Sequence, residues 1–186
     1  TGADWVHELD GELVELLDTG LDPTRLVAAA PQSLVVDGRL PRRPLVVASE
    51  FPRLTRNWLE TKRIDATFVR AYGATEVFPP EDADCIVDLV ATGATLRANQ
   101  LVEVDELLRS STRLYAHPRV LDDTEVRERI DALVVLLRSV LDARGRVVLD
   151  LNVDAARLET LLAVLPCMRE PTVAPLAHAA GYAVRA

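Results

Sequence analysis

Short apolar runs alternate with stretches of helical periodicity along most of the chain, a pattern typical of α/β folds. The apolar runs predict strands at Leu26–Ala30, Leu45–Ala48, Ala66–Arg70, Cys85–Val90 and Arg113–Ala116. A short helix is expected over Leu54–Lys62. The segment Gln32–Pro44 contains Asp37-Gly38 and two prolines. Turn-rich segments of this kind often join domains.

The strongest helical pattern runs from about Glu125 to Arg144. Asp123 or Thr124 can cap its start, and Gly145 follows its end. Apolar residues recur at spacings of three and four and form one broad stripe, made of Val126, Ile130, Leu133, Val134, Leu137, Val140 and Leu141. The pattern therefore predicts a long amphipathic helix.

The remainder of the chain predicts a strand, a helix and a further strand. Arg146–Val153 has a strand pattern, Asp154 can cap a helix that Pro166 ends, and a last strand begins at Tyr182–Arg185. These elements indicate a small α+β module that is cut short at its C-terminus.

Composition narrows the function classes. Of the 186 residues, 49% are hydrophobic and 27% charged, as in soluble globular proteins, and the net charge of −8 argues against a protein that coats nucleic acid. Aromatic residues make up only 4%, too few for stacking platforms. No apolar run is long enough to span a membrane. Cys85 and Cys167 cannot form a disulfide framework or a zinc site of their own, so we interpret them as buried thiols of a cytoplasmic protein.

The segment from Asp84 to Leu96 carries the most specific chemistry. A strand, the turn Thr92-Gly93-Ala94-Thr95 and a helix start would gather several backbone N–H groups around one point, where they can bind a phosphate. Asp88 lies before this turn and can accept hydrogen bonds from ligand hydroxyls, such as those of a ribose. A purely structural interpretation, in which Thr92 or Thr95 caps a helix and Gly93 relieves strain, is equally compatible with the local spacing.

A second cluster of interest is basic. Arg39, Arg42 and Arg43 lie in the predicted loop before the second strand. A solvated surface cluster is the favoured interpretation, and attraction of phosphate groups is the alternative.

Over nearly its whole length, the sequence resembles the ATP phosphoribosyltransferase family, the first enzyme of histidine biosynthesis. The resemblance rests on stretches that occur in the family's order: Thr1–Asp4, Leu16–Gly20, Ala48–Arg56, Gly73–Glu76, Asp88–Leu96, Leu165-Pro166 and Pro171–Leu176. The Phe-Pro-x-Leu-Thr-Arg and Pro-Thr-Val-Ala-Pro-Leu stretches and the loop after Asp88 are the most specific of these.

The resemblance implies an activity and its residues. Members transfer the phosphoribosyl group of phosphoribosyl pyrophosphate (PRPP) to N1 of the adenine of ATP, giving phosphoribosyl-ATP and pyrophosphate, with Mg²⁺ as cofactor. It implies that PRPP binds to Asp88, Ala91, Thr92, Gly93, Ala94 and Thr95. Asp88 and Glu76 would act in catalysis, and Gly2, Asp4 and Phe51 would line the nucleotide side. No dedicated metal site on the protein is expected, because magnesium is held largely by the pyrophosphate.

The resemblance also implies an architecture. The expected fold is α/β, with a two-lobe catalytic core like that of periplasmic binding proteins and a truncated ferredoxin-like α+β module. Residues 1–40 and 111–145 would be the remnant of the first lobe, 41–110 the second lobe with the PRPP loop, and 146–186 the regulatory module.

The family's long form implies further partners: inhibition by L-histidine and a homohexamer for the intact protein, in the cytoplasm, without nucleic acid or membrane. The family normally has some 70 residues before the Thr1–Asp4 stretch, by domain-size expectations. We therefore expect a chain truncated at both ends and inactive by itself.

Two other functions compete with this interpretation. A non-catalytic ligand-binding module could keep the same two-lobe scaffold, since a fold does not fix a function. A type I phosphoribosyltransferase shares the Thr-Gly-x-Thr turn but normally has paired acidic residues directly before it, whereas here Asp88 is followed by Leu89 and Val90.

Overall fold

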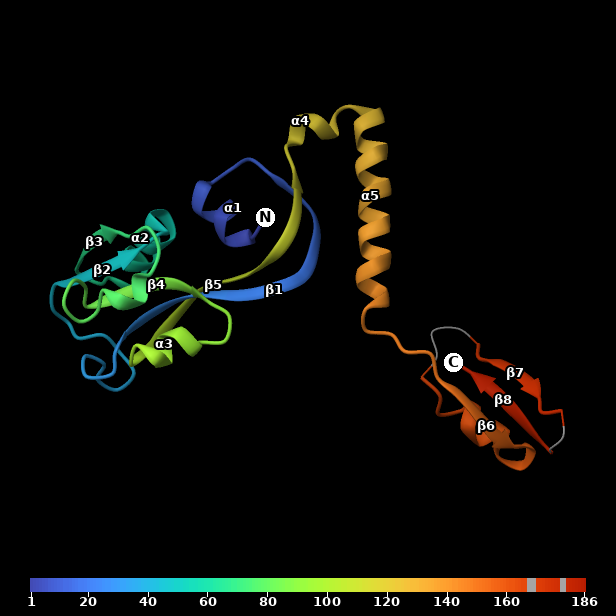
Figure 1. Cartoon of the computed structure of the whole chain (residues 1–186). Coiled ribbons are helices and arrows are strands. Elements are labelled where there is room, and N and C mark those ends of the chain that lie inside the picture. Colours follow the sequence, from blue (N-terminus) through green and yellow to red (C-terminus); the bar gives the residue numbers. More distant parts are fainter. Residues whose placement is uncertain (167–169, 178–179) are drawn as a thin grey trace. The chain divides into compact units, whose positions relative to one another are not determined.

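A five-stranded mixed sheet with the order β3-β2-β4-β1-β5 forms the centre of the N-terminal part of the structure, residues 1–138 (Figure 1). β2 is parallel to β3 and β4, whereas β1 is antiparallel to β4 and β5. The strand bounds are β1 Val14–Pro31, β2 Leu45–Ser49, β3 Ala66–Arg70, β4 Cys85–Val90 and β5 Leu101–Ala116. The α/β class predicted from the alternating pattern is confirmed.

This computed structural model describes residues 1–166, 170–177 and 180–186. The chain divides into two compact units, Thr1–Arg138 and Ser139–Ala186. None of the helices in these described ranges is long and apolar enough to cross a membrane.

Strands β1 and β5 are much longer than their sequence patterns predicted. Leu26–Ala30, the predicted range of β1, is fully buried, and all of it except Ala30 pairs with β4 as well as β5. From Val14 to Leu21, β1 pairs only with β5, with register shifts along the way. That half is largely exposed, so it lacks the continuous apolar run by which a buried strand is recognised.

The core of the first unit covers both faces of the sheet. One cluster, on the side of α2 (Pro52–Lys62), includes Leu26, Val47, Phe51, Trp58 and Cys85, and the other, on the side of α3 (Ala94–Ala98), includes Val27, Ala48, Ile86, Leu96 and Leu101. The predicted burial of Cys85 is confirmed, while Cys167 lies outside the described residues. The unit also contains α1 (Ala3–Leu9), the 3-10 helix η1 (Thr75–Val77) and α4 (Pro118–Leu121).

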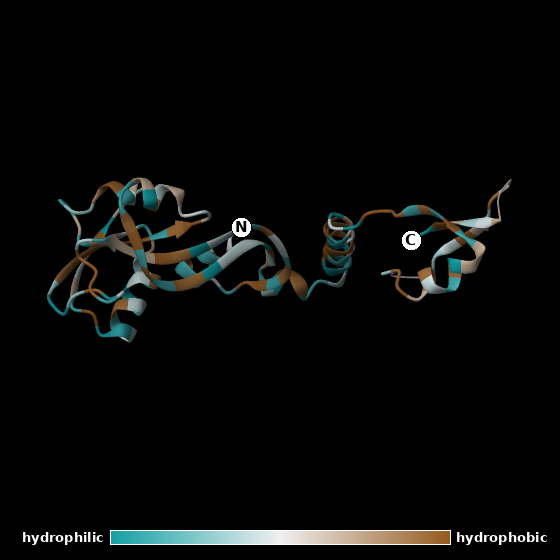
Figure 2. Ribbon diagram, turned by 90° about the horizontal axis from the view of Figure 1, so that it is seen from below, coloured by the Kyte–Doolittle hydropathy of each residue, from teal (hydrophilic) through white to brown (hydrophobic). Residues whose placement is uncertain are grey.

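Helix α5 (Thr124–Ala143) confirms the long helix and its cap. The Asp123 carboxylate accepts hydrogen bonds from the backbone N–H groups of Glu125 (3.0 Å) and Val126 (3.2 Å). None of the helix residues is buried, and Leu136 and Val140 are 66% and 59% exposed. Figure 2, which looks along α5, shows hydrophobic and hydrophilic residues around it.

The second unit is a three-stranded antiparallel sheet with the order β6-β8-β7. Its elements are β6 Asp150–Asp154, the 3-10 helix η2 Ala155–Arg157, α6 Leu158–Leu162, β7 Thr172–Pro175 and β8 Gly181–Arg185. The last strand is confirmed, but β6 begins four residues later than predicted.

Two details of the second unit correct the sequence pattern. Val147 and Val148 are 88% and 71% exposed, so their apolar character does not reflect burial in a sheet. Asp154 stands at the N-cap position of η2 and is also the last residue of β6, but its side chain makes no capping hydrogen bond.

Candidate functional site

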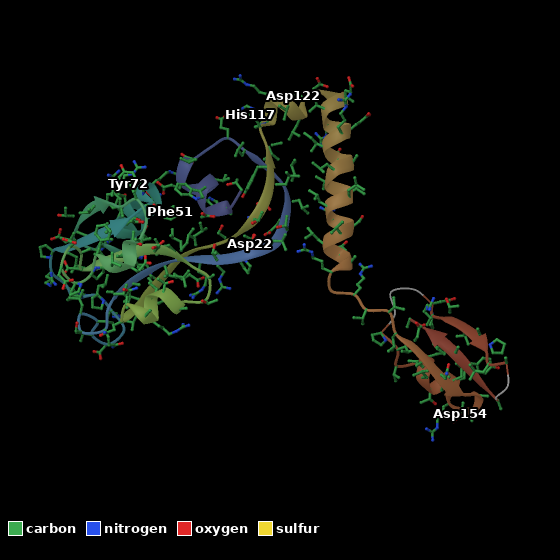
Figure 3. The ribbon with its side chains drawn as sticks, viewed as in Figure 1. Asp22, Phe51, Tyr72, His117, Asp122 and Asp154 are labelled. Carbon is green, nitrogen blue, oxygen red and sulfur yellow. The ribbon has the colours of Figure 1, made fainter. Side chains whose placement is uncertain are left out.

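The candidate site lies where the three parallel strands end. Because β2, β3 and β4 run in the same direction, the segments that follow them meet at one edge of the sheet, the usual place for ligands in α/β folds. These segments include Phe51 after β2, Tyr72 after β3 and Thr92 after β4. Phe51 and Tyr72 are labelled in Figure 3.

The turn after β4 has the geometry expected of a phosphate cradle. Gly93 has φ +72°, a left-handed conformation that favours glycine, and α3 starts at the next residue. The Ala94 N–H donates to the Thr92 hydroxyl (3.4 Å). The other N–H groups of the first helical turn have no partner within the helix and can donate to an anion. Since α3 has only five residues, these N–H groups contribute more than its dipole.

A small cavity of about 350 Å³ opens beside this turn. It is lined by residues 89–96 and by the side chains of Glu76 and Asp88. The structure thus brings together all the residues predicted to bind PRPP and both predicted catalytic carboxylates. Its size suits a phosphate with part of a sugar.

Asp88 is half-buried and held by hydrogen bonds. The hydroxyl of Thr75, which is fully buried, donates to its carboxylate, and the Leu89 N–H donates to the other carboxylate oxygen (2.7 Å). Burial raises the pKa of Asp88 above its ordinary value, the Thr75 bond opposes this, and the nearby negative charge of Glu76 adds to it. The carboxylate is therefore fixed in place and carries free lone pairs for ligand hydroxyls.

The role of Thr75 did not follow from the sequence. It begins η1, after two residues with positive φ, Gly73 (+96°) and Ala74 (+49°). Gly73–Glu76 was recognised as a stretch shared with the family, but only the fold brings the Thr75 hydroxyl to Asp88, which is 13 positions away in the sequence.

Arg97 is a second residue that the sequence did not reveal. Its guanidinium donates to the Thr92 carbonyl oxygen (3.0 Å), and a Cβ placed on Gly93 would lie 3.0 Å from the same nitrogen. The residues that line the cavity carry two carboxylates and no cation. Arg97 is thus a positive charge at the cradle's turn. The signal available in the sequence was its place four residues after Gly93, one helical turn on.

Gly2 stands at the N-cap position of α1, and Asp4 lies in its first turn. Asp4 is only 4% exposed, and its carboxylate accepts a hydrogen bond from the Ser110 hydroxyl on β5. A Cβ on Gly2 would come within 2.1 Å of an Asp4 carboxylate oxygen, so this close approach requires glycine. The Asp4 side chain therefore has a structural partner and does not face solvent.

Phe51 belongs to the core. It is 1% exposed, and its ring packs against Trp5 with the centroids 4.9 Å apart. The Phe51 N–H donates to the Ser49 hydroxyl (3.0 Å), which itself donates to the Val87 carbonyl oxygen (2.6 Å) on β4. The ring supports the end of β2 and offers no open face for stacking.

Contacts between α1 and α2 bring the Gly2–Asp4 segment to the same edge of the sheet. The buried Glu8 carboxylate on α1 accepts hydrogen bonds from the N–H groups of Arg53 (2.9 Å) and Leu54 (3.0 Å) in the first turn of α2. The Arg53 guanidinium forms an ion pair with Asp10 (2.6 Å). The predicted nucleotide side and the PRPP cradle thus share one edge.

The residues at the cradle fit a magnesium ion that is shared with a ligand. Magnesium is commonly held by one or two carboxylates together with substrate phosphates. Asp88 and Glu76 supply two carboxylates to one small cavity, close enough for the charge of one to raise the pKa of the other. Within the part of the chain that the structure describes, no group of three or more metal-binding side chains comes together.

Comparison with known proteins gives a consistent result. A family model described as ATP phosphoribosyltransferase (HisG) matches residues 1–139, and one described as the HisG C-terminal domain matches residues 143–186. A protein named ATP phosphoribosyltransferase from Chlorobium phaeovibrioides is 36% identical over 183 residues, which cover 96% of this chain and 62% of that protein. One of the same name from Pelotomaculum thermopropionicum is 35% identical over 189 residues, which cover 99% and 65%.

A solved structure agrees with these sequence relatives. A chain from the ATP phosphoribosyl transferase (HisG:HisZ) complex of Thermotoga maritima superposes with a TM-score of 0.68 at 26% sequence identity, covering 76% of this chain and 68% of that one. The present chain spans only about 62–65% of the length of the curated relatives named above.

Proposed function

Because this chain belongs to the ATP phosphoribosyltransferase family, we propose that the protein transfers the phosphoribosyl group of PRPP to N1 of the adenine of ATP, the first step of L-histidine biosynthesis. The bond between the anomeric carbon and the pyrophosphate oxygen breaks, and a bond from the anomeric carbon to N1 forms. Pyrophosphate leaves with the bonding electron pair. The matching family models and relatives do not favour the alternative of a non-catalytic binding module.

The cradle beside Asp88 is the observation that carries the proposal. The backbone N–H groups of this turn other than that of Ala94, which donates to the Thr92 hydroxyl, bind the 5′-phosphate, and the two threonine hydroxyls add donors. Asp88, oriented by Thr75, accepts hydrogen bonds from the ribose hydroxyls. Glu76 lies on the same cavity and balances the positive charge that develops on the ribose ring. Catalysis then depends on position and charge, with no nucleophile from the protein.

We assign Mg²⁺ to the carboxylates of Asp88 and Glu76 together with the pyrophosphate of PRPP. Held there, the ion would neutralise negative charge on the pyrophosphate, which makes pyrophosphate a better leaving group. The two carboxylates would then have two roles: they orient the sugar, and they hold the ion together with the pyrophosphate.

We assign the ATP side to the segment that holds Gly2 and Asp4 and to the neighbourhood of Phe51. Since the Asp4 and Phe51 side chains are buried, the backbone and the exposed neighbours of these residues would meet the nucleotide. Trp5, which is 40% exposed and covers Phe51, is such a neighbour.

The finer architecture and the partners are part of the same proposal. Residues 1–40 and 111–145 would belong to the first lobe of a core like that of periplasmic binding proteins, 41–110 to the second, and 146–186 to a ferredoxin-like regulatory module. The family's long form then supports inhibition by L-histidine, a homohexamer and a cytoplasmic location.

Calorimetric titration of PRPP with Mg²⁺ into the 186-residue chain tests the cradle. Valine at Gly93 would fill the turn and meet Arg97, so Gly93→Val should weaken binding at least about ten-fold. Gly20→Val is the matched control, because Gly20 has a similar φ of +64° but nothing within 4 Å of an added Cβ. Both variants carry comparable backbone strain, of roughly 1–2 kcal/mol. Equal affinity for the two variants, or no binding by a folded wild-type chain, would refute the cradle.

A further inference from the structure

A second crevice, of about 870 Å³, lies at the opposite end of the parallel strands. Residues 38–44, which lead into β2, and residues 62–65, which lead into β3, form much of its wall. The Leu45 N–H donates to the Asp65 carbonyl oxygen (3.0 Å) and joins these two segments. The PRPP cradle follows the other end of β4, and the two cavities share no lining residue.

The crevice is basic although the chain as a whole is acidic. Five cationic side chains line it, against the two carboxylates of Asp65 and Asp105. The five are Arg39, Arg42, Arg43, Lys62 and Arg63. A net charge of −8 over the whole chain would not by itself concentrate five cations in one cavity.

Two of the five cations are held by carboxylates, and three are free. Arg43 pairs with Asp84 (2.7 Å), and Lys62 pairs with Asp105 (2.6 Å). Within the described ranges, the side chains of Arg39, Arg42 and Arg63 have no hydrogen bond or ion pair. Three unpaired guanidinium groups around one opening can bind phosphate oxygens in bidentate pairs.

The loop that carries Arg39 and Arg42 is already ordered, and Arg63 directly follows α2. Val36 and Arg39 exchange two backbone hydrogen bonds of 3.0 Å around the Asp37-Gly38 turn, in which both residues have positive φ. Pro41 and Pro44 restrict the rest of the segment. Binding would therefore cost little loop ordering, which favours a preformed site.

We propose that this crevice is a second anion site, which binds a soluble compound that carries several linked phosphate groups. The cavity volume lies within the range of small-molecule sites, and the wall combines the charges with the apolar residues Leu40, Ile64 and Val104, as such sites usually do. The site is separate from the proposed transfer reaction and does not depend on it.

Trp58 offers a local reporter of binding. Its ring lines the crevice, and its indole N–H donates to the same Asp105 oxygen (2.9 Å) that pairs with Lys62. An anion that attracts Lys62 changes the charge beside the indole and hence its fluorescence. The chain has one other tryptophan, Trp5, which Trp5→Phe removes while keeping an aromatic ring against Phe51.

The experiment titrates inorganic triphosphate, without magnesium, into the Trp5→Phe chain at a salt concentration of about 0.1 M, where distant charges are screened. Saturable change of Trp58 fluorescence is expected. Adding Arg39→Glu and Arg42→Glu together should weaken binding at least about ten-fold, whereas Lys at both positions, which keeps the charge but loses the bidentate geometry, should weaken it less. Inorganic phosphate should bind more weakly than triphosphate.

Two controls separate this site from general charge effects and from the cradle. Arg138→Glu with Arg144→Glu makes the same change of net charge at exposed arginines outside the crevice and should leave the affinity unchanged. Gly93→Val should leave it unchanged as well. The proposal is overturned if triphosphate gives no saturable signal, if both charge-reversal pairs weaken binding equally, or if Gly93→Val abolishes it.

Discussion

At the scale of single residues, burial separates the two halves of the candidate site. Asp88 is half-buried and opens onto a cavity, whereas Asp4 and Phe51 are almost wholly enclosed. An enclosed side chain is engaged by its own neighbours: Ser110 for Asp4 and Trp5 for Phe51. Asp88 can still accept hydrogen bonds from a ligand, but the partial burial of its carboxylate costs free energy in the folded state.

This cost predicts how stability depends on pH at Asp88. Since burial raises the folded-state pKa of Asp88 above its ordinary 3.8, the folded state binds the proton more tightly than the unfolded state. The stabilisation of the folded state that protonated Asp88 contributes is therefore fully present below pH 3.8, and it is lost as the pH rises through the raised pKa. Urea unfolding of wild type and Asp88→Asn at several pH values should show wild type losing stability relative to the variant as the pH increases.

Asp84 supplies a control of opposite sign. Its hydrogen bond and ion pair with Arg43 lower the pKa of Asp84. Stability from Asp84 is thus present above pH 3.8 and is lost as the pH falls through the lowered pKa. Wild type should gain stability relative to Asp84→Asn as the pH rises, and the same trend for both variants would contradict the assignment at Asp88.

At the scale of elements, helix α2 begins without a cap of its own. Phe51 stands at its N-cap position and makes no side-chain capping bond. The two N–H groups at Arg53 and Leu54 are satisfied instead by Glu8, 45 positions earlier in the chain. A carboxylate at a helix N-terminus also interacts favourably with the helix dipole. The contact joins α1 to α2 and so fixes one wall of the candidate site.

Glu8→Ala should lower the free energy of unfolding by about 2–3 kcal/mol, because two partly buried N–H groups lose a charged acceptor. Glu8→Gln, which keeps one acceptor oxygen, should cost roughly half as much. Chemical denaturation measures both. Glu12→Ala is the control, since Glu12 is exposed and has no partner among the described residues. An equal effect of Glu8→Ala and Glu12→Ala would show that the cap contributes nothing.

At the scale of the whole molecule, the boundary between the two compact units falls within α5, between Arg138 and Ser139. The core residues of the first unit include Cys85 on β4, which is fully buried. Burial raises the pKa of the Cys85 thiol to about 12, so the folded state exposes neither the sulfur nor its reactive thiolate. The thiol is therefore a probe for opening of the first unit alone.

In a Cys167→Ser background, labelling of Cys85 by a disulfide reagent at pH 8 should follow global unfolding of the first unit. The expected opening free energy lies in the range of about 5–15 kcal/mol that is usual for domains. Under the proposed function, added PRPP should lower the rate, because the cradle belongs to the same unit. Fast labelling in native buffer, at the rate of a free thiol, would show that β4 is not the stable centre of this sheet.

The sequence by itself determined the elements whose signal is local. β3 and β4 have the bounds that their apolar runs predicted, because each is a short strand whose pattern lies within its own residues. The turn at Gly93 and the cap at Asp123 were also predictable, since both depend on residues within three positions.

The tertiary structure alone decided what depends on distant partners. The exposed half of β1 becomes a strand because β5 pairs with it, and Glu8 becomes the cap of α2 because α1 lies against that helix. Thr75 reaches Asp88, and the arginines before β2 meet Lys62 and Arg63, for the same reason. A hydrogen bond or a shared cavity joins atoms that are close in space, and the periodicity of a sequence reports only neighbours along the chain.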